Sequence, residues 1–133
     1  MIVAANLVLR FLLEIAALVA VVYCGFTLPD GWLLRILAGV GLPVAMAAVW
    51  GIFRIPNDGG APIVEVAPRL RLAIEVVYFV LAVALLAVAG HGGLALLFLL
   101  LLLFHYAVGY QRTLALVSGR LPPPDNASLG GSR

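Results

Sequence analysis

Four long apolar segments dominate the sequence and restrict what it can fold into. Counted between the strongly polar residues, they cover residues 11–28, 36–53, 72–90 and 92–111. Each has about 18 to 20 residues, close to the number that a helix needs to cross the hydrocarbon core of a bilayer. Backbone groups in lipid must be hydrogen-bonded within the chain, so each segment is predicted to be a helix. The expected fold class is therefore all-α.

Composition also indicates that lipid, not water, surrounds most of the chain. Of the 133 residues, 65% are hydrophobic and 11% are charged, whereas a soluble domain is roughly half apolar and a quarter charged. The lipid bilayer is thus the expected partner. The net charge of +2 is too small to favour nucleic-acid binding. The single cysteine, Cys24, is expected to pack as a small hydrophobic residue.

The connections predict how the helices are paired. The stretches "TLPDGW" and "GHGG" have the residues of tight turns, so the first two helices and the last two helices should form antiparallel hairpins. We expect a four-helix transmembrane bundle made of two antiparallel helical hairpins within residues 1–113. Its helices are predicted at about 4–28, 32–54, 69–90 and 92–112, with a polar loop at 55–68 between the hairpins.

The C-terminal segment has a different composition from the rest. Residues 114–133 end in "LPPPDNASLGGSR", which is rich in Pro, Gly and Ser. Such a composition cannot bury enough apolar surface to order itself. We therefore predict a disordered tail.

The arginines predict the orientation in the membrane. Only Arg35 flanks one side of the predicted spans. The other side is flanked by Arg10, Arg54, Arg69, Arg71, Arg112 and Arg120. Because positive residues accumulate on the cytoplasmic side, both termini and the loop at 55–68 are expected in the cytoplasm, in a multi-pass protein.

Two short motifs occur twice. "LRFLLE" opens the first helix and "LRLAIE" the third, while a G-x-x-R pattern closes the second and fourth helices. A duplicated hairpin would produce this pattern as a tandem parallel repeat. Arginines placed at helix ends by the positive-inside rule would also produce it, and both interpretations stay open.

The candidate site consists of the polar residues inside the predicted spans. Glu14 follows Arg10 and Glu75 follows Arg71 at a spacing of four residues, which places each pair on one helix face. Asn6 extends the first pair into a polar stripe. Ionised side chains in lipid are costly and therefore point into the protein. The pairs either fasten the ends of the first and third helices together or form a cation or proton site.

Other polar or unusual residues receive simpler interpretations. Asn6 and His105 are each expected to make an interhelical hydrogen bond. The small residues Gly41, Ala45 and Ala48 should allow close helix packing, and Pro43 should bend the second helix.

Motifs for catalysis are lacking in the sequence. The two histidines are not at metal-ligand spacing, and there is no phosphate-binding, nucleotide-binding or nucleophile motif. We expect neither enzymatic activity nor a metal or cofactor.

Three stretches resemble a known family. "NLVLRFLLEIAAL", "GVGLPVAMAAVWGIF" and "PRLRLAIEVVYFVLAVALLAVAGH" occur in this order and are similar to the YrdB-like family, over about residues 5–108. These are small bacterial integral membrane proteins with a domain of unknown function. The resemblance implies four helices in the bacterial inner (plasma) membrane and no assigned activity.

Three functions remain open at this point. The first is a non-enzymatic accessory subunit that binds a membrane-protein partner or its own copies. The second is a small oligomeric transporter or channel that uses Glu14 and Glu75. The third is a hydrophobic-ligand site between the hairpins, lined by Phe79, Phe98 and Phe104.

Overall fold

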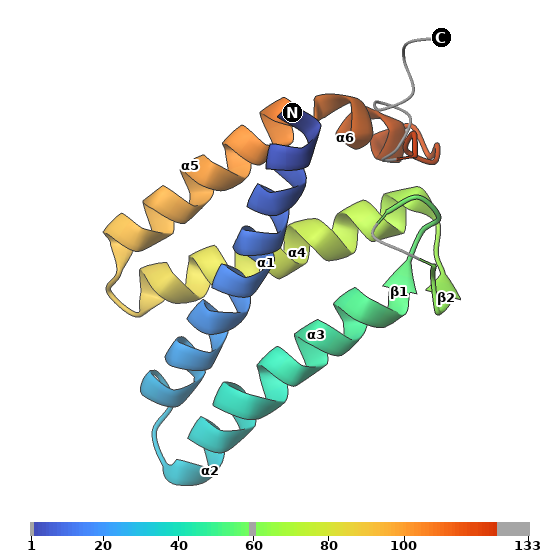
Figure 1. Cartoon of the computed structure of the whole chain (residues 1–133). Helices are drawn as coiled ribbons and strands as arrows, with labels where there is room; N and C mark the ends of the chain where they lie inside the picture. The colour runs from blue at the N-terminus through green and yellow to red at the C-terminus, as the bar shows by residue number, and fades with distance from the viewer. Residues whose placement is uncertain (1, 59–60, 125–133) are drawn as a thin grey trace, which may run out of the picture.

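The computed structural model describes residues 2–58 and 61–124, and it is mostly helical (Figure 1). This confirms the predicted all-α class. In chain order its elements are α1 (Ile2–Thr27), α2 (Trp32–Ile36), the π-helical turn η1 (Leu37–Gly41), α3 (Leu42–Ile52), β1 (Phe53–Arg54), β2 (Val64–Glu65), α4 (Pro68–Val88), α5 (Gly92–Val108) and α6 (Tyr110–Val117).

Several helices are long and apolar enough to cross a membrane. Within residues 2–58 and 61–124, three qualify on their own, at Ala4–Thr27, Trp32–Ile52 and Pro68–Val88. A fourth is obtained if α5 and α6 are taken as one span, but these two helices are bent by 80° relative to each other. The second span includes α2, η1 and α3.

Tight turns join the helices where the sequence predicted them. Gly31 and Gly90 have φ angles of 86° and 84°, a conformation that is costly for residues with a Cβ atom. At one end of the molecule lie these two turns, and at the other lie the start of α1, the β1–β2 connection and α6 (Figure 1). The chain thus has one end with minimal loops and one end that carries most of its polar residues.

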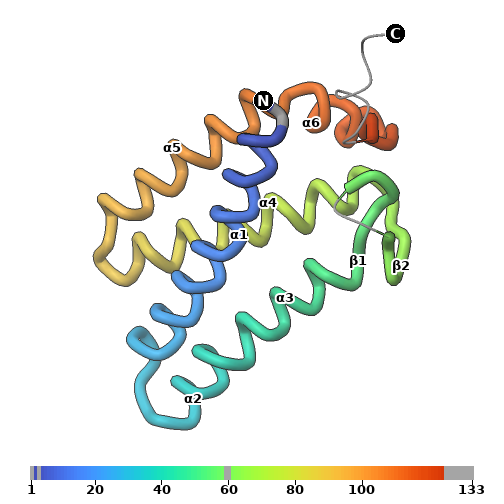
Figure 2. Tube along the Cα trace, in the orientation of Figure 1, coloured from blue at the N-terminus to red at the C-terminus, as the bar shows by residue number. Residues whose placement is uncertain are grey.

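Helix α1 lies between the other helices and contacts η1, α3, α4 and α5. It approaches η1 closely at Gly25, where an added Cβ would lie 2.5 Å from the carbonyl carbon of Ala38. Gly39 in η1 is packed just as tightly against Phe26. From this contact α1 and α3 diverge toward the polar end (Figure 2).

The prediction of which small residues mediate packing was wrong. Gly41, Ala45 and Ala48 are exposed, and nothing lies within 4 Å of a Cβ added at Gly41. The face of α3 that packs inward is the one with the buried Pro43 and Met46. At the proline, the helix adjusts through the π-helical turn η1, because proline has no N–H to donate to the preceding turn.

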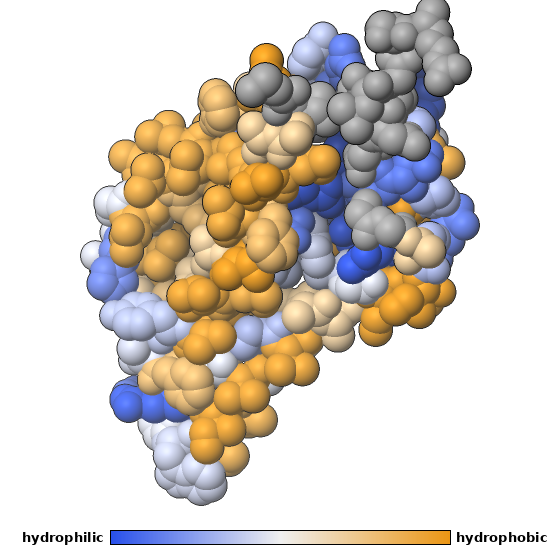
Figure 3. Space-filling view, viewed as in Figure 1, coloured by the Kyte–Doolittle hydropathy of each residue, from blue (hydrophilic) through white to orange (hydrophobic). Residues whose placement is uncertain are grey.

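The buried apolar core runs along α1, α4 and α5. It contains Leu13, Ala17, Val21 and Cys24 of α1, Tyr78, Phe79, Ala82 and Leu86 of α4, and Ala95, Phe98 and Leu102 of α5. Cys24 is fully buried, as expected for a small hydrophobic residue. Most other apolar side chains of the helices point outward, and they cover the visible surface of the helices (Figure 3).

The structure departs from the predicted fourth helix at Gly109. Helix α5 ends there, and α6 turns away and continues to Val117, so residues 114–117 of the predicted tail are helical. Glycine weakens the helix at this point, and the Asn6 side chain lies 3.1 Å from where a Cβ of Gly109 would be. Residues 125–133 of the predicted tail lie outside the described residues.

The predicted loop at 55–68 is more ordered than expected. Strands β1 and β2 pair in parallel, with Phe53 opposite Val64 and Arg54 opposite Glu65. Ile55 directly after β1 is fully buried. The connection therefore folds back toward the helices, and this brings Asp58 inside.

Candidate functional site

The predicted polar residues lie at the end of the molecule that carries α6 and the β1–β2 connection. Asn6, Arg10 and Glu14 are on the first half of α1, and Arg71 and Glu75 are on the first two turns of α4. Both helices have an unbroken apolar core face beyond these residues. Their polar ends converge because the cores of α1 and α4 pack together.

Asp58 is the centre of the site, and three arginines surround its carboxylate. Nη1 and Nη2 of Arg10 donate to its two oxygens at 2.6 and 3.3 Å. Nε and Nη2 of Arg112 donate at 3.0 and 2.9 Å, and Nε of Arg71 donates at 3.4 Å. One carboxylate from the connection is thus bonded to helices α1, α4 and α6 together.

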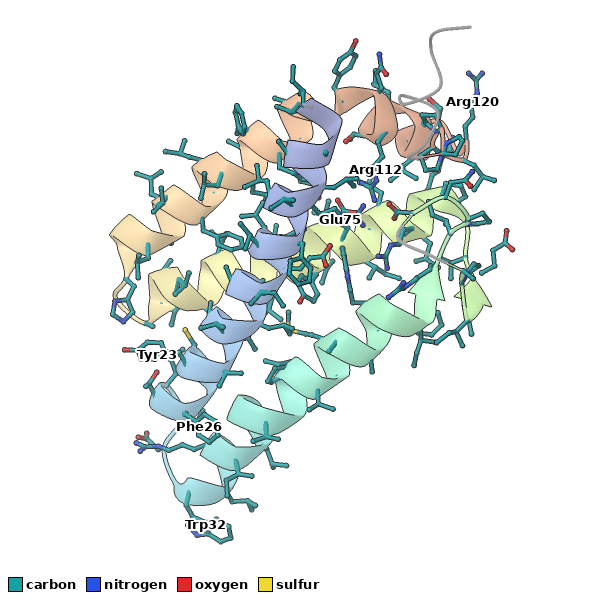
Figure 4. All side chains as sticks on the ribbon, in the orientation of Figure 1. Tyr23, Phe26, Trp32, Glu75, Arg112 and Arg120 are labelled. Carbon is teal, nitrogen blue, oxygen red and sulfur yellow. The ribbon has the colours of Figure 1, made fainter. Side chains whose placement is uncertain are left out.

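Glu75 is the second buried acid, with a side chain that is 0% exposed. Arg112 donates to it from Nη1 at 3.2 Å and from Nη2 at 2.8 Å, and Nη2 of Arg10 lies 3.7 Å away. Figure 4 shows Arg112 pointing from α6 toward Glu75 on α4. Because Arg112 bonds both Asp58 and Glu75, it ties α6 to α4 and to the connection.

Arg71 has a different role from the one predicted. Within the described part of the chain, no ion pair joins it to Glu75. Its Nη1 donates instead to the carbonyls of Trp50 and Phe53, at 3.0 and 2.7 Å, and its guanidinium carbon lies 4.0 Å from the centre of the Trp50 ring. Arg71 therefore caps the C-terminal end of α3, so the expected pairing within α4 was wrong.

Glu14 keeps the predicted partner and is the most accessible acid of the site. Nε of Arg10 donates to it at 3.1 Å, and its side chain is 19% exposed. It lines a cavity of about 170 Å³ between α1 and α3, together with Trp50, Asp58 and three arginines. The backbone carbonyl of Glu14 accepts a hydrogen bond of 3.1 Å from the Tyr78 hydroxyl.

We call this set of six side chains the charged cluster: Arg10, Glu14, Asp58, Arg71, Glu75 and Arg112. Three positive and three negative charges give it a formal charge of zero. Burial alone would raise the pKa of Asp58, but the hydrogen bonds and charges of Arg10 and Arg112 outweigh burial and hold that pKa well below its usual range. Asp58 is therefore a carboxylate at neutral pH.

Asn6 lies apart from the charged cluster and contacts α5. Its Oδ1 accepts a hydrogen bond from Nδ1 of His105 at 2.9 Å. This interhelical bond was expected for both residues. It fixes the start of α1 beside the end of α5, next to the bend at Gly109.

Two central residues were not predicted as part of the site. Asp58 stands in a polar loop, where an acid is ordinary, and no local pattern shows that the loop folds inward. Arg112 was interpreted only as a residue flanking the membrane. The sequence offers one signal for Arg112. Two glutamates inside apolar helices need positive charges nearby, and arginines other than Arg10 and Arg71 flank the same side of the predicted spans.

The geometry also bears on metal binding and on the hydrophobic-ligand site that was one of the open functions. Among residues 2–58 and 61–124, no group of three or more His, Cys, Asp and Glu side chains could hold a metal ion. Of the three phenylalanines proposed for a hydrophobic-ligand site, Phe79 and Phe98 have ring centres 6.2 Å apart in the buried core, whereas Phe104 is 60% exposed.

The fold and the site define a class of protein: a mostly helical chain with membrane-length apolar helices and a buried charged cluster at one end. The chain belongs to the family described as "Protein of unknown function (DUF2568)", whose model matches residues 8–103. It is also 36% identical over 110 residues to the uncharacterized protein YrdB of Bacillus subtilis (strain 168), a match that covers 80% of the chain and 89% of that protein. The resemblance noted in the sequence is thereby confirmed. No solved structure matches the chain.

Proposed function

We propose that the chain is a small, non-enzymatic protein of the bacterial inner membrane that acts as an accessory subunit for a membrane-protein partner or for its own copies. It crosses the membrane four times, as two antiparallel hairpins, with α5 as the fourth crossing. Both termini and the β1–β2 connection are in the cytoplasm, since all but Arg35 of the arginines near the spans lie at that end.

One observation carries this proposal: the charges inside the protein compensate one another. Each arginine of the charged cluster is bonded to an acid of the same cluster. The charges of such a buried site are compensated within the protein, without a bound substrate or ion. The remaining surface of the spans is apolar side chains exposed to lipid or to another helix.

Purification from native membranes tests the proposal. The chain with an affinity tag is extracted in a mild detergent, and the sizes and components of its complexes are measured. A stoichiometric membrane-protein partner or a defined homo-oligomer is expected. A chain that isolates only as a monomer, from cells in which its deletion changes no membrane complex, would contradict the proposal.

A second candidate, a cation or proton pathway, is favoured by the cavity beside Glu14. Among the described residues of the charged cluster, Arg10 is the ion-pair partner of Glu14, and Glu14 also lines the cavity. Glu75 does not reach that cavity and is paired twice, so the geometry supports the candidate for Glu14 alone. Proton or cation flux into liposomes is the assay, with Glu75→Asp as a charge-conserving comparison. Flux abolished by Glu14→Gln would establish this function, and flux absent from the wild-type chain would exclude it.

A further inference from the structure

Helix α6 presents three chemically different faces. Leu116 is fully buried, and Arg112, four residues earlier, enters the charged cluster. Gln111 and Ser118, seven residues apart, are exposed and polar. Tyr110, Leu114 and Val117 are each more than half exposed, and their spacing of four and three residues places them on one side of the helix.

This helix has a defined beginning and end, so its exposed apolar residues are not part of an unstructured tail. It begins after the bend at Gly109. It ends in a Schellman motif: Gly119, at φ 73°, donates its N–H to Leu116, and Arg120 donates its N–H to Ala115. Nε of Arg69 also donates to the carbonyl of Val117 at 2.9 Å.

The bend of 80° between α5 and α6 sets the direction of α6. If α5 crosses the membrane, α6 runs near the membrane plane, at the end of the molecule that holds the arginines (Figure 1). Successive residues of a helix are rotated by roughly 100° about its axis. The polar residues Gln111 and Ser118 therefore lie about midway around α6 between the exposed apolar residues and the buried side that carries Arg112 and Leu116. The helix then has protein on one side, water on another and lipid on a third.

We infer that α6 is an interfacial anchor whose stripe of Tyr110, Leu114 and Val117 inserts into the boundary between headgroups and acyl chains of the cytoplasmic leaflet. Amphipathic helices that lie in this boundary bury an apolar face and keep a polar one in water. Arg120 points away from the charged cluster (Figure 4) and is placed to contact the phosphates of anionic lipids.

The anchor has a consequence for the charged cluster. Arg112 is the residue of α6 that compensates Asp58 and Glu75. Lipid contact on the opposite side of the helix therefore helps to hold Arg112 in place. This inference rests on the proposed membrane insertion, and its test must distinguish the failure of one from the failure of the other.

Spin labels on the full-length chain provide that test. In a Cys24→Ala background, single cysteines replace Leu114, Gln111 or Leu100, all of which are exposed. The labelled proteins are reconstituted into vesicles of phosphatidylethanolamine and phosphatidylglycerol. Collision rates are then measured with oxygen, which concentrates in lipid, and with a water-soluble nickel chelate.

The expected result is an oxygen-to-nickel ratio at Leu114 that exceeds the ratio at Gln111 and lies below the ratio at Leu100, which is midway along α5. A ratio at Leu114 as low as that at Gln111 would mean that the stripe faces water, and the anchor would be refuted. Low accessibility to both reagents would place another protein there, which also contradicts the anchor. A water-accessible Leu100 would instead refute membrane insertion itself.

Discussion

Replacing Asp58 by Asn should destabilise the folded protein strongly. The change leaves three buried arginines with two acids, and the exposed fraction of those arginine side chains is 19% or less. Breaking a buried ion pair from one side costs about 3–5 kcal/mol. Asn keeps the shape of the side chain and one accepting oxygen, and Arg112 can move toward water, so we expect a loss of about 3 kcal/mol in the free energy of unfolding.

The assay is reversible unfolding in mixed detergent micelles, followed by far-ultraviolet circular dichroism. Asp30→Asn is the matched control, because Asp30 is an exposed aspartate in the turn at the other end of the molecule. It should change the unfolding free energy by less than about 0.5 kcal/mol. If Asp58→Asn and Asp30→Asn have the same stability, Asp58 is not the centre of a buried cluster and the reasoning fails.

The lowered pKa of Asp58 predicts how the free energy of unfolding changes at acidic pH. The pKa of Asp58 in the folded chain lies below its ordinary value of 3.8, so the unfolded chain binds the proton more readily. Its contribution is therefore fully present above the unfolded pKa and is lost as the pH falls below about 4 toward the folded pKa. Unfolding measured from pH 7 to pH 3 should show this loss in the wild type, and Asp58→Asn should show a shallower decline. Identical pH profiles of the two chains would contradict the assignment.

Two further predictions concern the other acids and the glycines. Glu75→Gln should lower the free energy of unfolding by about 3 kcal/mol, and Glu14→Gln should lower it by about 1 kcal/mol. The difference arises because Glu75 is fully buried between two arginines, whereas Glu14 is partly exposed beside one. Equal losses of unfolding free energy in detergent would contradict this ranking. Gly25→Ala should cost about 1–3 kcal/mol, since its new Cβ would overlap the backbone of η1. Gly41→Ala is the control, because nothing lies within 4 Å of a Cβ added at Gly41. It should leave the melting temperature unchanged or raise it. If the Gly41→Ala chain melts at as low a temperature as the Gly25→Ala chain, the packing of α1 on η1 is refuted.

Much of the fold could be predicted because lipid imposes simple rules on sequence. Apolar length determined the helices, and turn residues determined where they end. The helix predicted at 69–90 is α4 at Pro68–Val88, and the one predicted at 4–28 is α1 at Ile2–Thr27. The break at Gly109 was missed because one glycine in an apolar run does not end a helix by itself. The neighbouring Asn6 side chain, distant in sequence, occupies the space there.

The charged cluster was predicted only in part, because local spacing reveals partners on one helix but not partners that are distant in sequence. Arg10 and Glu14 are neighbours on one helix, so local spacing was enough to pair them. Asp58 reaches the cluster because the β1–β2 connection folds inward, and Arg112 reaches it because the chain bends between α5 and α6. Neither the folded connection nor the bend produces a periodic pattern in the sequence. The repeated "LR…E" motif also misled, because Arg71 bonds the end of α3 and not its own glutamate. Likewise the two G-x-x-R motifs have different structures, since Arg54 is in β1 and Arg112 is in α6.

The charged cluster fastens α6 and the β1–β2 connection to helices α1 and α4. A double-mutant cycle on the unfolding free energy, with Asp58→Asn, Arg112→Gln and the two changes combined, tests it most directly. Because the two side chains share two hydrogen bonds in a buried site, we expect the double variant to lose about 2 kcal/mol less unfolding free energy than the sum of the two single losses. Losses that add to within about 0.5 kcal/mol would show that Asp58 and Arg112 are not coupled in one cluster.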